Sequence, residues 1–365
     1  MESQRYQAFA TQWMTESFRR QTAMISTVLH IFIDHFPAGW MKAVIDNDRI
    51  AKPAYFAYRD ALTPTMVSFK PRRFRYFEGE TAAIETWICN DLPEAFDSYS
   101  LYYEVVRNHE VLRKGVQTVG IQPSCSAYAG DIQFDTTGIA GEIEVRAALI
   151  DQNNQVVHYN TLNLKIASQN TDLKGTTIQA GETVGSLLNT YTNYQKIGDS
   201  TVTPDTIIID DMAVFKGQET KLRQKVEAGT KLVLYRPAPG TYRIFDEDVK
   251  IKPCGMLPVN FVSRNTGHLM VDGFEPDDFR FWFDEKQQMI TPILENTFTS
   301  HNKNYDAILT SANMNIKGEW RPELACGERK IGKGSVIICE LILDDRLKAN
   351  PVAQQFAKKM LIKQP

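Results

Sequence analysis

Three pairs of adjacent aspartates are the residues whose spacing first suggests chemistry: Asp210-Asp211, Asp277-Asp278 and Asp344-Asp345. Two carboxylates together can serve acid–base catalysis or hold a metal ion. Adjacent side chains at the end of a strand point to opposite sides, however, so such a pair seldom converges on one atom. Asp210-Asp211 follows the strand expected at 206–209 in an α/β sheet, at the edge where such sheets bind ligands. A hydrolase that uses Asp210 or Asp211 therefore stays open as a minor alternative.

His268 and the cysteines give weaker chemical signals. No nucleophile stands beside His268 in the stretch 264–268, so we predict a turn there. The five cysteines are scattered and show neither the CxxC nor the histidine spacing of metal sites. We predict free and mostly buried thiols, no metal site and no cofactor. The cysteines are Cys89, Cys125, Cys254, Cys326 and Cys339.

A second polar group follows the apolar run 27–33. Asp34, His35 and Trp40 stand where a buried parallel strand would open into its C-terminal loop, the face that carries active sites in (β/α)8 barrels. We predict that they line a substrate pocket, with capping of the barrel as the structural alternative. His30 lies inside the apolar run, where it is either a core histidine or a further substrate contact.

Composition excludes several classes of function. The 365 residues are 43% hydrophobic and 23% charged, with a formal net charge of −3. Because no run of five or more basic residues occurs, we expect no nucleic-acid partner. Apolar runs are far shorter than the ~20 residues that span a bilayer, so we expect no membrane partner. The first residues do not resemble a secretory leader, and the sequence leaves the compartment unknown.

The first 63 residues have the order helix, buried strand, loop, helix, which is part of a (β/α)8 barrel. Residues 2–21 are predicted as a helix because apolar side chains recur every three or four positions. Residues 26–33 lack polar alternation, as expected of a strand covered on both faces. A second helix is predicted from Lys52 to Leu62, with Pro53 in its first turn and Pro64 beyond its end. A fragment of this size cannot close a barrel.

Residues 64–168 alternate apolar and polar side chains in short segments, which predicts an immunoglobulin-like β-sandwich. The expected strands are 66–69, 82–89, 100–107, 132–134 and 142–150. Residues 169–176 are polar and turn-prone, and we predict a linker there.

Residues 177–365 alternate strands and helices, which predicts a doubly wound α/β domain. The expected elements are a helix at 184–194, a strand at 206–209, a helix at 217–228, strands at 231–235 and 335–343, and a helix at 351–362. The aromatic stretch 279–283 is expected to pack a β-rich insertion between them. The chain as a whole is therefore predicted to be multidomain, with both α and β structure.

The N-terminal segment resembles the end of the barrel of glycoside hydrolase family 2, the β-galactosidases, β-mannosidases and β-glucuronidases. The stretch 3–8 with Glu16 and Arg19 is similar to the helix before the last barrel strand. The closing strand, loop and helix are matched by Asp34, Pro37, Trp40, Asp46, Lys52, Pro53, Tyr55 and Tyr58. The sandwich that follows stands where the family carries its own sandwich domain.

The resemblance implies a retaining glycosidase that hydrolyses β-linked sugars with two glutamates about 5 Å apart. Those glutamates lie on earlier barrel strands in the family, and neither has a counterpart here. Glu2 and Glu16 lie on the helix outside the barrel. The chain by itself is therefore predicted to be inactive, with no catalytic residue. His30 and Ile33 replace the tryptophan and asparagine of many members, so sugar specificity is not carried over.

The last domain resembles the α/β domain of class I glutamine amidotransferases. In active members a nucleophilic cysteine occupies a tight turn after a central strand. Here the strand 231–235 is followed by Arg236-Pro237-Ala238-Pro239-Gly240, which contains neither a thiol nor a hydroxyl. We therefore predict that this domain is catalytically silent.

Two functions from different classes follow. The first is the C-terminal part of a glycosidase, whose partners are the missing N-terminal barrel portion and, in the intact enzyme, a carbohydrate substrate; a homo-oligomer is compatible with it. The second is a non-enzymatic carbohydrate-binding or assembly module, in which the barrel remnant is vestigial. A chain built for independence should not expose the apolar run 27–33.

Overall fold

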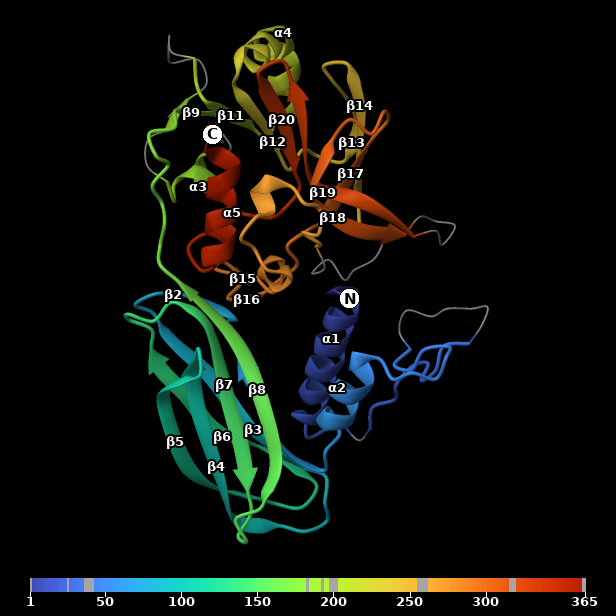
Figure 1. Cartoon of the computed structure of the whole chain (residues 1–365), viewed down its shortest axis with the longest axis vertical. Helices are drawn as coiled ribbons and strands as arrows, with labels where there is room; N and C mark the ends of the chain where they lie inside the picture. Colours follow the sequence, from blue (N-terminus) through green and yellow to red (C-terminus); the bar gives the residue numbers. More distant parts are fainter. Residues whose placement is uncertain are drawn as a thin grey trace. The chain divides into compact units, whose positions relative to one another are not determined.

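The structure is a computed structural model that describes residues 2–24, 26–35, 43–181, 184–191, 194–196, 203–254, 262–314 and 320–362. The chain divides into two compact units, residues 1–167 (unit 1) and residues 168–365 (unit 2) (Figure 1). Among the described residues, none of the helices has both the length and the apolar character that a bilayer crossing requires.

Unit 1 begins with helices α1 (Glu2–Arg19) and α2 (Pro53–Ala61), which pack against each other (Figure 1). Both were expected. Pro53 begins α2 because a missing N–H costs nothing in the first turn of a helix. The rings of Phe9 and Trp13 on α1 contact Phe74 of the sandwich, with centroids 5.9 and 5.3 Å apart. Helix α1 therefore lies against the sandwich as well as against α2.

The strand expected at Thr27–Ile33 is not formed, which corrects the sequence interpretation. Residues 26–32 belong to no strand, and residue 33 makes only an isolated parallel bridge to Ile45. Val28 is 90% exposed and Phe32 is 47% exposed. A strand of a parallel barrel needs a neighbour on each side for its backbone and a covered face on each side for its side chains. The described residues of unit 1 supply neither.

The rest of unit 1 is a β-sandwich, as predicted. One sheet has the order β1-β3-β6 and the other the order β2-β8-β7-β4-β5. The five strands expected from the sequence correspond to β1, β3, β4, β6 and β7. The bounds are β1 Thr65–Pro71, β2 Arg75–Phe77, β3 Thr81–Asn90, β4 Phe96–Arg107, β5 Glu110–Ile121, β6 Cys125–Asp135, β7 Gly141–Ile150 and β8 Val156–Ala167.

Polar side chains join the two sheets to each other and to α1. His158 Nδ1 of β8 accepts a hydrogen bond from the N–H of Val67 in β1, at 3.3 Å, and Asn160 Nδ2 donates to the Val67 carbonyl at 3.0 Å. Glu16 of α1 accepts from Ser68 Oγ at 2.6 Å and from Asn160 Nδ2 at 3.1 Å. All these side chains are buried, so each bond is made out of contact with water. Glu16 thus connects α1 to a strand of each sheet.

Unit 2 is built on one ten-stranded sheet, which begins β10-β9-β11-β12-β20 with parallel strands and continues β19-β17-β14-β13 with antiparallel ones, while β18 pairs with β19. The bounds are β9 Ile178–Ala180, β10 Tyr194–Lys196, β11 Thr206–Ile209, β12 Lys231–Tyr235, β13 Gly240–Ile244, β14 Glu247–Pro253, β17 Asn296–Ser300, β18 Asp306–Met314, β19 Trp320–Ile331 and β20 Gly334–Cys339. Strands β11 and β12 have the predicted bounds, whereas β20 ends four residues earlier than expected.

Alternate residues of the parallel strands enter two separate cores. Val233 and Ile337 pack on one face with Phe356 of helix α5 (Pro351–Leu361). Leu232 and Val336 pack on the other face with residues of helix α4 (Met212–Ala228). Both faces of these strands are therefore covered, which is why they read as continuous apolar runs.

The smaller elements of unit 2 surround this sheet. They are α3 Gly185–Leu188, η1 Leu269–Val271, η2 Pro276–Phe279, β15 Phe283–Asp284 and β16 Met289–Ile290. The helix expected at 184–194 is only the single turn α3, and part of that stretch lies outside the described residues. The insertion expected around 279–283 contributes Trp282, which is fully buried.

Candidate functional site

Of the four residues predicted to line a substrate pocket, His30, Asp34 and His35 lie in the part of the chain that the structure describes. Asp34 is turned into an ion pair, while His30 and His35 are exposed. Trp40 lies outside the described residues. None of the three described residues lines the pocket of unit 1 considered below. Their role in binding a substrate stays a prediction.

Asp34 instead has a structural partner in Lys52. Lys52 Nζ lies 2.6 Å from Asp34 Oδ2, and the two side chains are only 12% and 13% exposed. Lys52 immediately precedes α2, and the N–H of Asp34 donates to the carbonyl of Ile45. The pair therefore fastens the end of the apolar run to the start of α2.

Helices α1 and α2 and the segment between them carry an unusual apolar surface. Eight of the sixteen large apolar side chains that are exposed in the described chain fall between residues 14 and 62. The buried apolar residues of this segment are all small or medium-sized: Ala43, Val44, Ala54 and Ala61. We call the eight exposed side chains the apolar surface; they are Met14, Phe18, Met24, Val28, Phe32, Ile50, Phe56 and Leu62.

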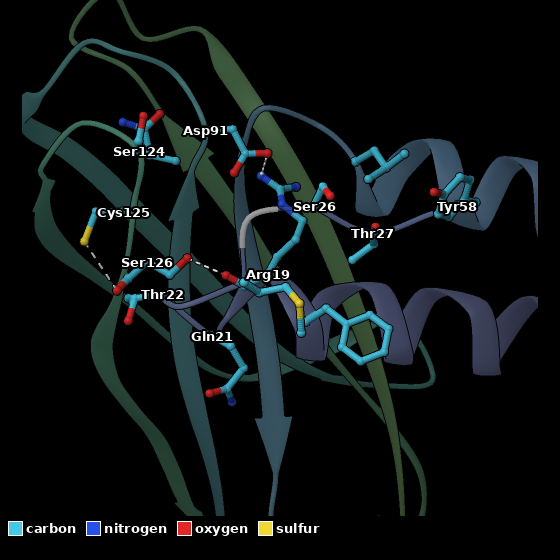
Figure 2. Close-up of a pocket in the computed structure, with 14 residues that line it drawn as sticks. Arg19, Gln21, Thr22, Ser26, Thr27, Tyr58, Asp91, Ser124, Cys125 and Ser126 are labelled. Atoms are coloured by element: carbon cyan, nitrogen blue, oxygen red, sulfur yellow. Dashed lines mark hydrogen bonds and ion pairs between the residues drawn. The ribbon is translucent and has the colours of Figure 1, made fainter. Parts of the chain in front are cut away.

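A pocket of about 230 Å³ opens where the ends of α1 and α2 meet two loops of the sandwich (Figure 2). The helices contribute Arg19 and Tyr58, among others. The loop after α1 contributes residues 21, 22, 24, 26 and 27. The sandwich contributes Asn90 at the end of β3, Asp91 after it, and residues 124–126 before and within β6. Segments far apart in the sequence thus form one cavity within unit 1.

Arg19 fixes the geometry of this pocket. Its side chain is 7% exposed, and Nη2 lies 2.9 Å from Asp91 Oδ2. The guanidinium also donates to the carbonyl oxygens of Ala61, Thr63 and Pro64, at 2.9, 2.6 and 2.9 Å. Helix α2 ends at Ala61, so Arg19 satisfies a carbonyl that has no partner inside the helix. The fixed fork of the guanidinium suits this role.

Hydrogen bonds also fix the side of the pocket that the sandwich forms. Ser126 Oγ donates to the carbonyl of Arg19 at 2.5 Å, as Figure 2 shows. Asn90 Nδ2 donates to the carbonyls of Glu94 and Gln122, and its Oδ1 accepts from Thr65 Oγ1. Because these bonds use up the polar atoms of Asn90, that side chain serves as scaffold.

Other lining side chains keep their hydrogen-bonding capacity. Five hydroxyl groups and one amide make no hydrogen bond with the described part of the chain, and neither does Asp91 Oδ1. The hydroxyls belong to Thr22, Ser26, Thr27, Tyr58 and Ser124, and the amide to Gln21. The spacing of these residues in the sequence gave no sign of the pocket, because it is assembled by contacts between distant segments.

The aspartate pairs of unit 2 have structural partners. Asp211 caps α4 by accepting from the N–H of Ala213 at 2.7 Å. Asp278 takes part in the capping box of η2, and Asp344 accepts from Tyr235 Oη at 2.8 Å. His268 caps η1, where Nδ1 accepts from the N–H of Met270 at 3.1 Å. The turn predicted in the stretch 264–268 is found at residues 265–266, and His268 follows it as the cap of η1.

Arg236 occupies the position at which the amidotransferase resemblance would place a nucleophile. It follows β12 with a left-handed backbone (φ 46°), which is strained for a residue with a side chain. Its guanidinium lies 2.8 Å from Glu295 and 3.4 Å from Asp344. The cation is thus bound between two carboxylates, and the turn presents no nucleophile.

The pKa values of two carboxyl groups of unit 2, Glu340 and Glu328, are shifted in opposite directions. Glu340 follows β20, is 1% exposed and has no hydrogen-bond partner of good geometry among the described residues. Burial raises the pKa of this carboxyl to about 7, against smaller opposing effects of Asn296 and Arg236. Burial would raise the pKa of Glu328 as well, but hydrogen bonds, first from His268, outweigh it and lower that pKa to about 2.

The cysteines are free thiols, as predicted. Cys89, Cys326 and Cys339 are buried, and Cys125 and Cys254 are partly exposed. Burial raises the pKa of Cys254 to about 11. Within the ranges that the structure describes, no three histidine, cysteine or acidic side chains gather as metal ligands.

Solved structures with local similarity include several glycoside hydrolases. The exo-chitosanase CsxA of Amycolatopsis orientalis is 12% identical over 44% of this chain and 19% of its own, with a TM-score of 0.36. The β-D-mannosidase of Dictyoglomus thermophilum is 17% identical over 44% of this chain and 19% of its own, with a TM-score of 0.34. The chain thus spans about a fifth of the length of these enzymes.

A small domain of another kind matches as well. The CARDB domain of the PF1109 protein of Pyrococcus furiosus, solved in complex with di-metal ions, is 15% identical over 29% of this chain and 94% of its own, with a TM-score of 0.25. No protein-family model matches the sequence, and no curated protein matches it.

Proposed function

We propose that the chain is the C-terminal part of a family 2 glycoside hydrolase, which hydrolyses β-linked sugars with two glutamates supplied by the remainder of its barrel. In this proposal α1, the apolar run 27–33 and α2 complete that barrel. The sandwich and unit 2 are accessory domains, and unit 2 is a silent relative of the amidotransferase α/β domain.

The apolar surface is the observation that carries the proposal. Val28 and Phe32 belong to the run that should be the last barrel strand, and they are 90% and 47% exposed. Burying a side chain of this size stabilises an interface by about 1.5 to 3 kcal/mol. Eight exposed side chains of this kind fall between residues 14 and 62, and such a concentration suits a surface that another chain or domain covers.

The ion pair between Asp34 and Lys52 agrees with this proposal. It holds the end of the run against the start of α2, which is where the last strand and helix of a barrel meet. The run would become a strand once neighbouring strands bind its backbone. Asp34, His35 and Trp40 would then stand at the C-terminal face of the barrel, which carries the active site.

The first test is the DNA sequence upstream of Met1, read in frame for several hundred codons. The proposal expects an open frame that encodes a barrel with two glutamates at strand ends. A stop codon close upstream, with no barrel-encoding gene nearby, would overturn it and favour the carbohydrate-binding or assembly module.

A second test uses paired valine variants of the assembled protein. Val28→Glu places a charge on the apolar surface, and Val116→Glu is the matched control because Val116 of β5 is also exposed, at 67%. We expect Val28→Glu to weaken association with the barrel portion, and hydrolysis of aryl β-glycosides, by about tenfold or more. Equal effects of the two variants would contradict the assigned surface.

A further inference from the structure

Some side chains that line the pocket of unit 1 make hydrogen bonds within the chain, and others make none with the described residues. Arg19, Ser126 and Asn90 are held by hydrogen bonds within the chain. The hydroxyls of Thr22 and Ser124 are not, and Figure 2 shows both residues among those that line the cavity. The pocket therefore has a fixed frame, and the remaining polar side chains face solvent, where they are available to a ligand.

The charge of the pocket favours a neutral ligand. The cation of Arg19 and the anion of Asp91 lie 2.9 Å apart and offset each other. The other polar lining groups are hydroxyls, amides and the Cys125 thiol. A ligand with a net charge would leave water for a site that offers it no counterion.

Hydroxyl groups are the best complement to the lining. Each can donate one hydrogen bond and accept others, as the hydroxyls of Thr22, Ser26, Thr27, Tyr58 and Ser124 can. Asp91 Oδ1 and the carbonyl of the Gln21 amide add acceptors. Phe18, Met24 and Leu62 supply apolar contact at the same pocket, which suits the C–H face of a ring.

The volume limits the size of the ligand. At about 230 Å³ the cavity is smaller than the ~300 to 1,000 Å³ of pockets for drug-sized ligands. We infer that this pocket binds a neutral polyhydroxylated molecule the size of a single sugar ring. Residues of unit 1 alone form the site. Phe18, Met24 and Leu62 belong also to the apolar surface, so the inference concerns the chain without the barrel portion, and the test uses that chain.

The test is a titration of the full chain with D-galactose and with D-mannose, followed by ligand-detected NMR and by calorimetry. Binding of at least one of them is expected, with weaker binding of the charged D-glucuronate. In the double variant Thr22→Ala with Ser124→Gly two hydroxyls are lost, and binding is expected to weaken by about ten- to thirtyfold. Glycine is chosen at residue 124 because its backbone has φ 46°.

Thr118→Ala is the matched control, because Thr118 is an exposed hydroxyl of β5 outside the pocket. It is expected to leave the affinity unchanged. Circular dichroism and thermal unfolding establish that each variant is folded. The inference is overturned if neither sugar binds the folded wild-type chain, or if the double variant binds as tightly as the Thr118→Ala control.

Discussion

Arg19 lies 2.9 Å from Asp91, yet the two partners differ sharply in burial, with side chains 7% and 60% exposed. The guanidinium also binds three carbonyl oxygens between residues 61 and 64, in the connection from α2 to β1. The carboxylate of Asp91, by contrast, makes no other hydrogen bond among the described residues. We therefore expect the ion pair to contribute less to the stability of unit 1 than the three hydrogen bonds that Arg19 donates to carbonyl groups.

Substitution of the two partners should accordingly have unequal effects. Arg19→Ala removes three hydrogen bonds to carbonyl groups, each worth about 1 kcal/mol, and should lower the free energy of unfolding of unit 1 by about 3 kcal/mol. Asp91→Ala removes an exposed ion pair and should cost about 1 kcal/mol or less. Urea unfolding of the two variants measures both values, and equal losses would contradict this assignment.

Asp34→Asn should destabilise unit 1 because it leaves the Lys52 ammonium without its partner at 12% exposure. Removing one partner of a buried pair costs about 3 to 5 kcal/mol. The double variant Asp34→Asn with Lys52→Met should recover part of that loss. A double-mutant cycle by urea unfolding measures the coupling, and a coupling near zero would show that the pair does not stabilise the segment.

The stability of unit 2 should fall between about pH 4.5 and pH 7 because of Glu340. Its folded pKa is about 7, above the unfolded value, so the folded state keeps a proton that the unfolded state has lost. Above pH 7 this penalty is constant, at about 3 kcal/mol. Glu340→Gln should therefore be more stable than wild type at pH 8 and similar to it at pH 4. Unfolding at the two pH values tests this, and a pH-independent difference would disprove it.

Glu328 should give the opposite dependence. Its folded pKa is about 2, below the unfolded value, so its contribution is present above about pH 4.5 and is lost as the pH falls toward 2. Glu328→Gln should cost about 3 kcal/mol at pH 7 and progressively less below pH 4.5. The measurement is the difference in unfolding free energy from wild type at pH 7 and pH 3. A constant difference would show that the loss is one of packing.

Cys125 should be the first thiol to react in the native protein. It is partly exposed, whereas Cys89, Cys326 and Cys339 are buried and Cys254 has its pKa raised to about 11. Brief alkylation at pH 8 followed by peptide mass spectrometry should find the label on Cys125. Cys125→Ser should remove the fast reaction, and rapid labelling of Cys326 or Cys339 would contradict their burial.

The sequence predicted those elements whose signal is local. Strands β11 and β12 were found within their bounds because Thr206–Ile209 and Lys231–Tyr235 are short apolar runs between turn residues. Strands β2, β5 and β8 were missed. Strand β5 in particular is largely exposed, so it lacks the apolar alternation by which a half-buried strand is recognised.

The run 27–33 was assigned as a strand because its side chains are apolar, but a strand also needs neighbours for its backbone, and these are absent from the described residues. The unit 1 pocket was not foreseen for a similar reason. Arg19 and Asp91 are 72 positions apart in the sequence, and no periodicity connects them. Contacts between residues so far apart in the sequence can be recognised only in the folded chain.

The bonds of Glu16 have a consequence for how unit 1 can be divided. Glu16 is bound to Ser68 in one sheet and to Asn160 in the other, and Asn160 also holds the carbonyl of Val67. A fragment that begins at residue 64 would keep every strand of the sandwich, but it would lose Glu16 and expose Ser68 and Asn160 to water. The helix thus acts as the third layer of the domain, and the sandwich is not a portable module that can be excised without it.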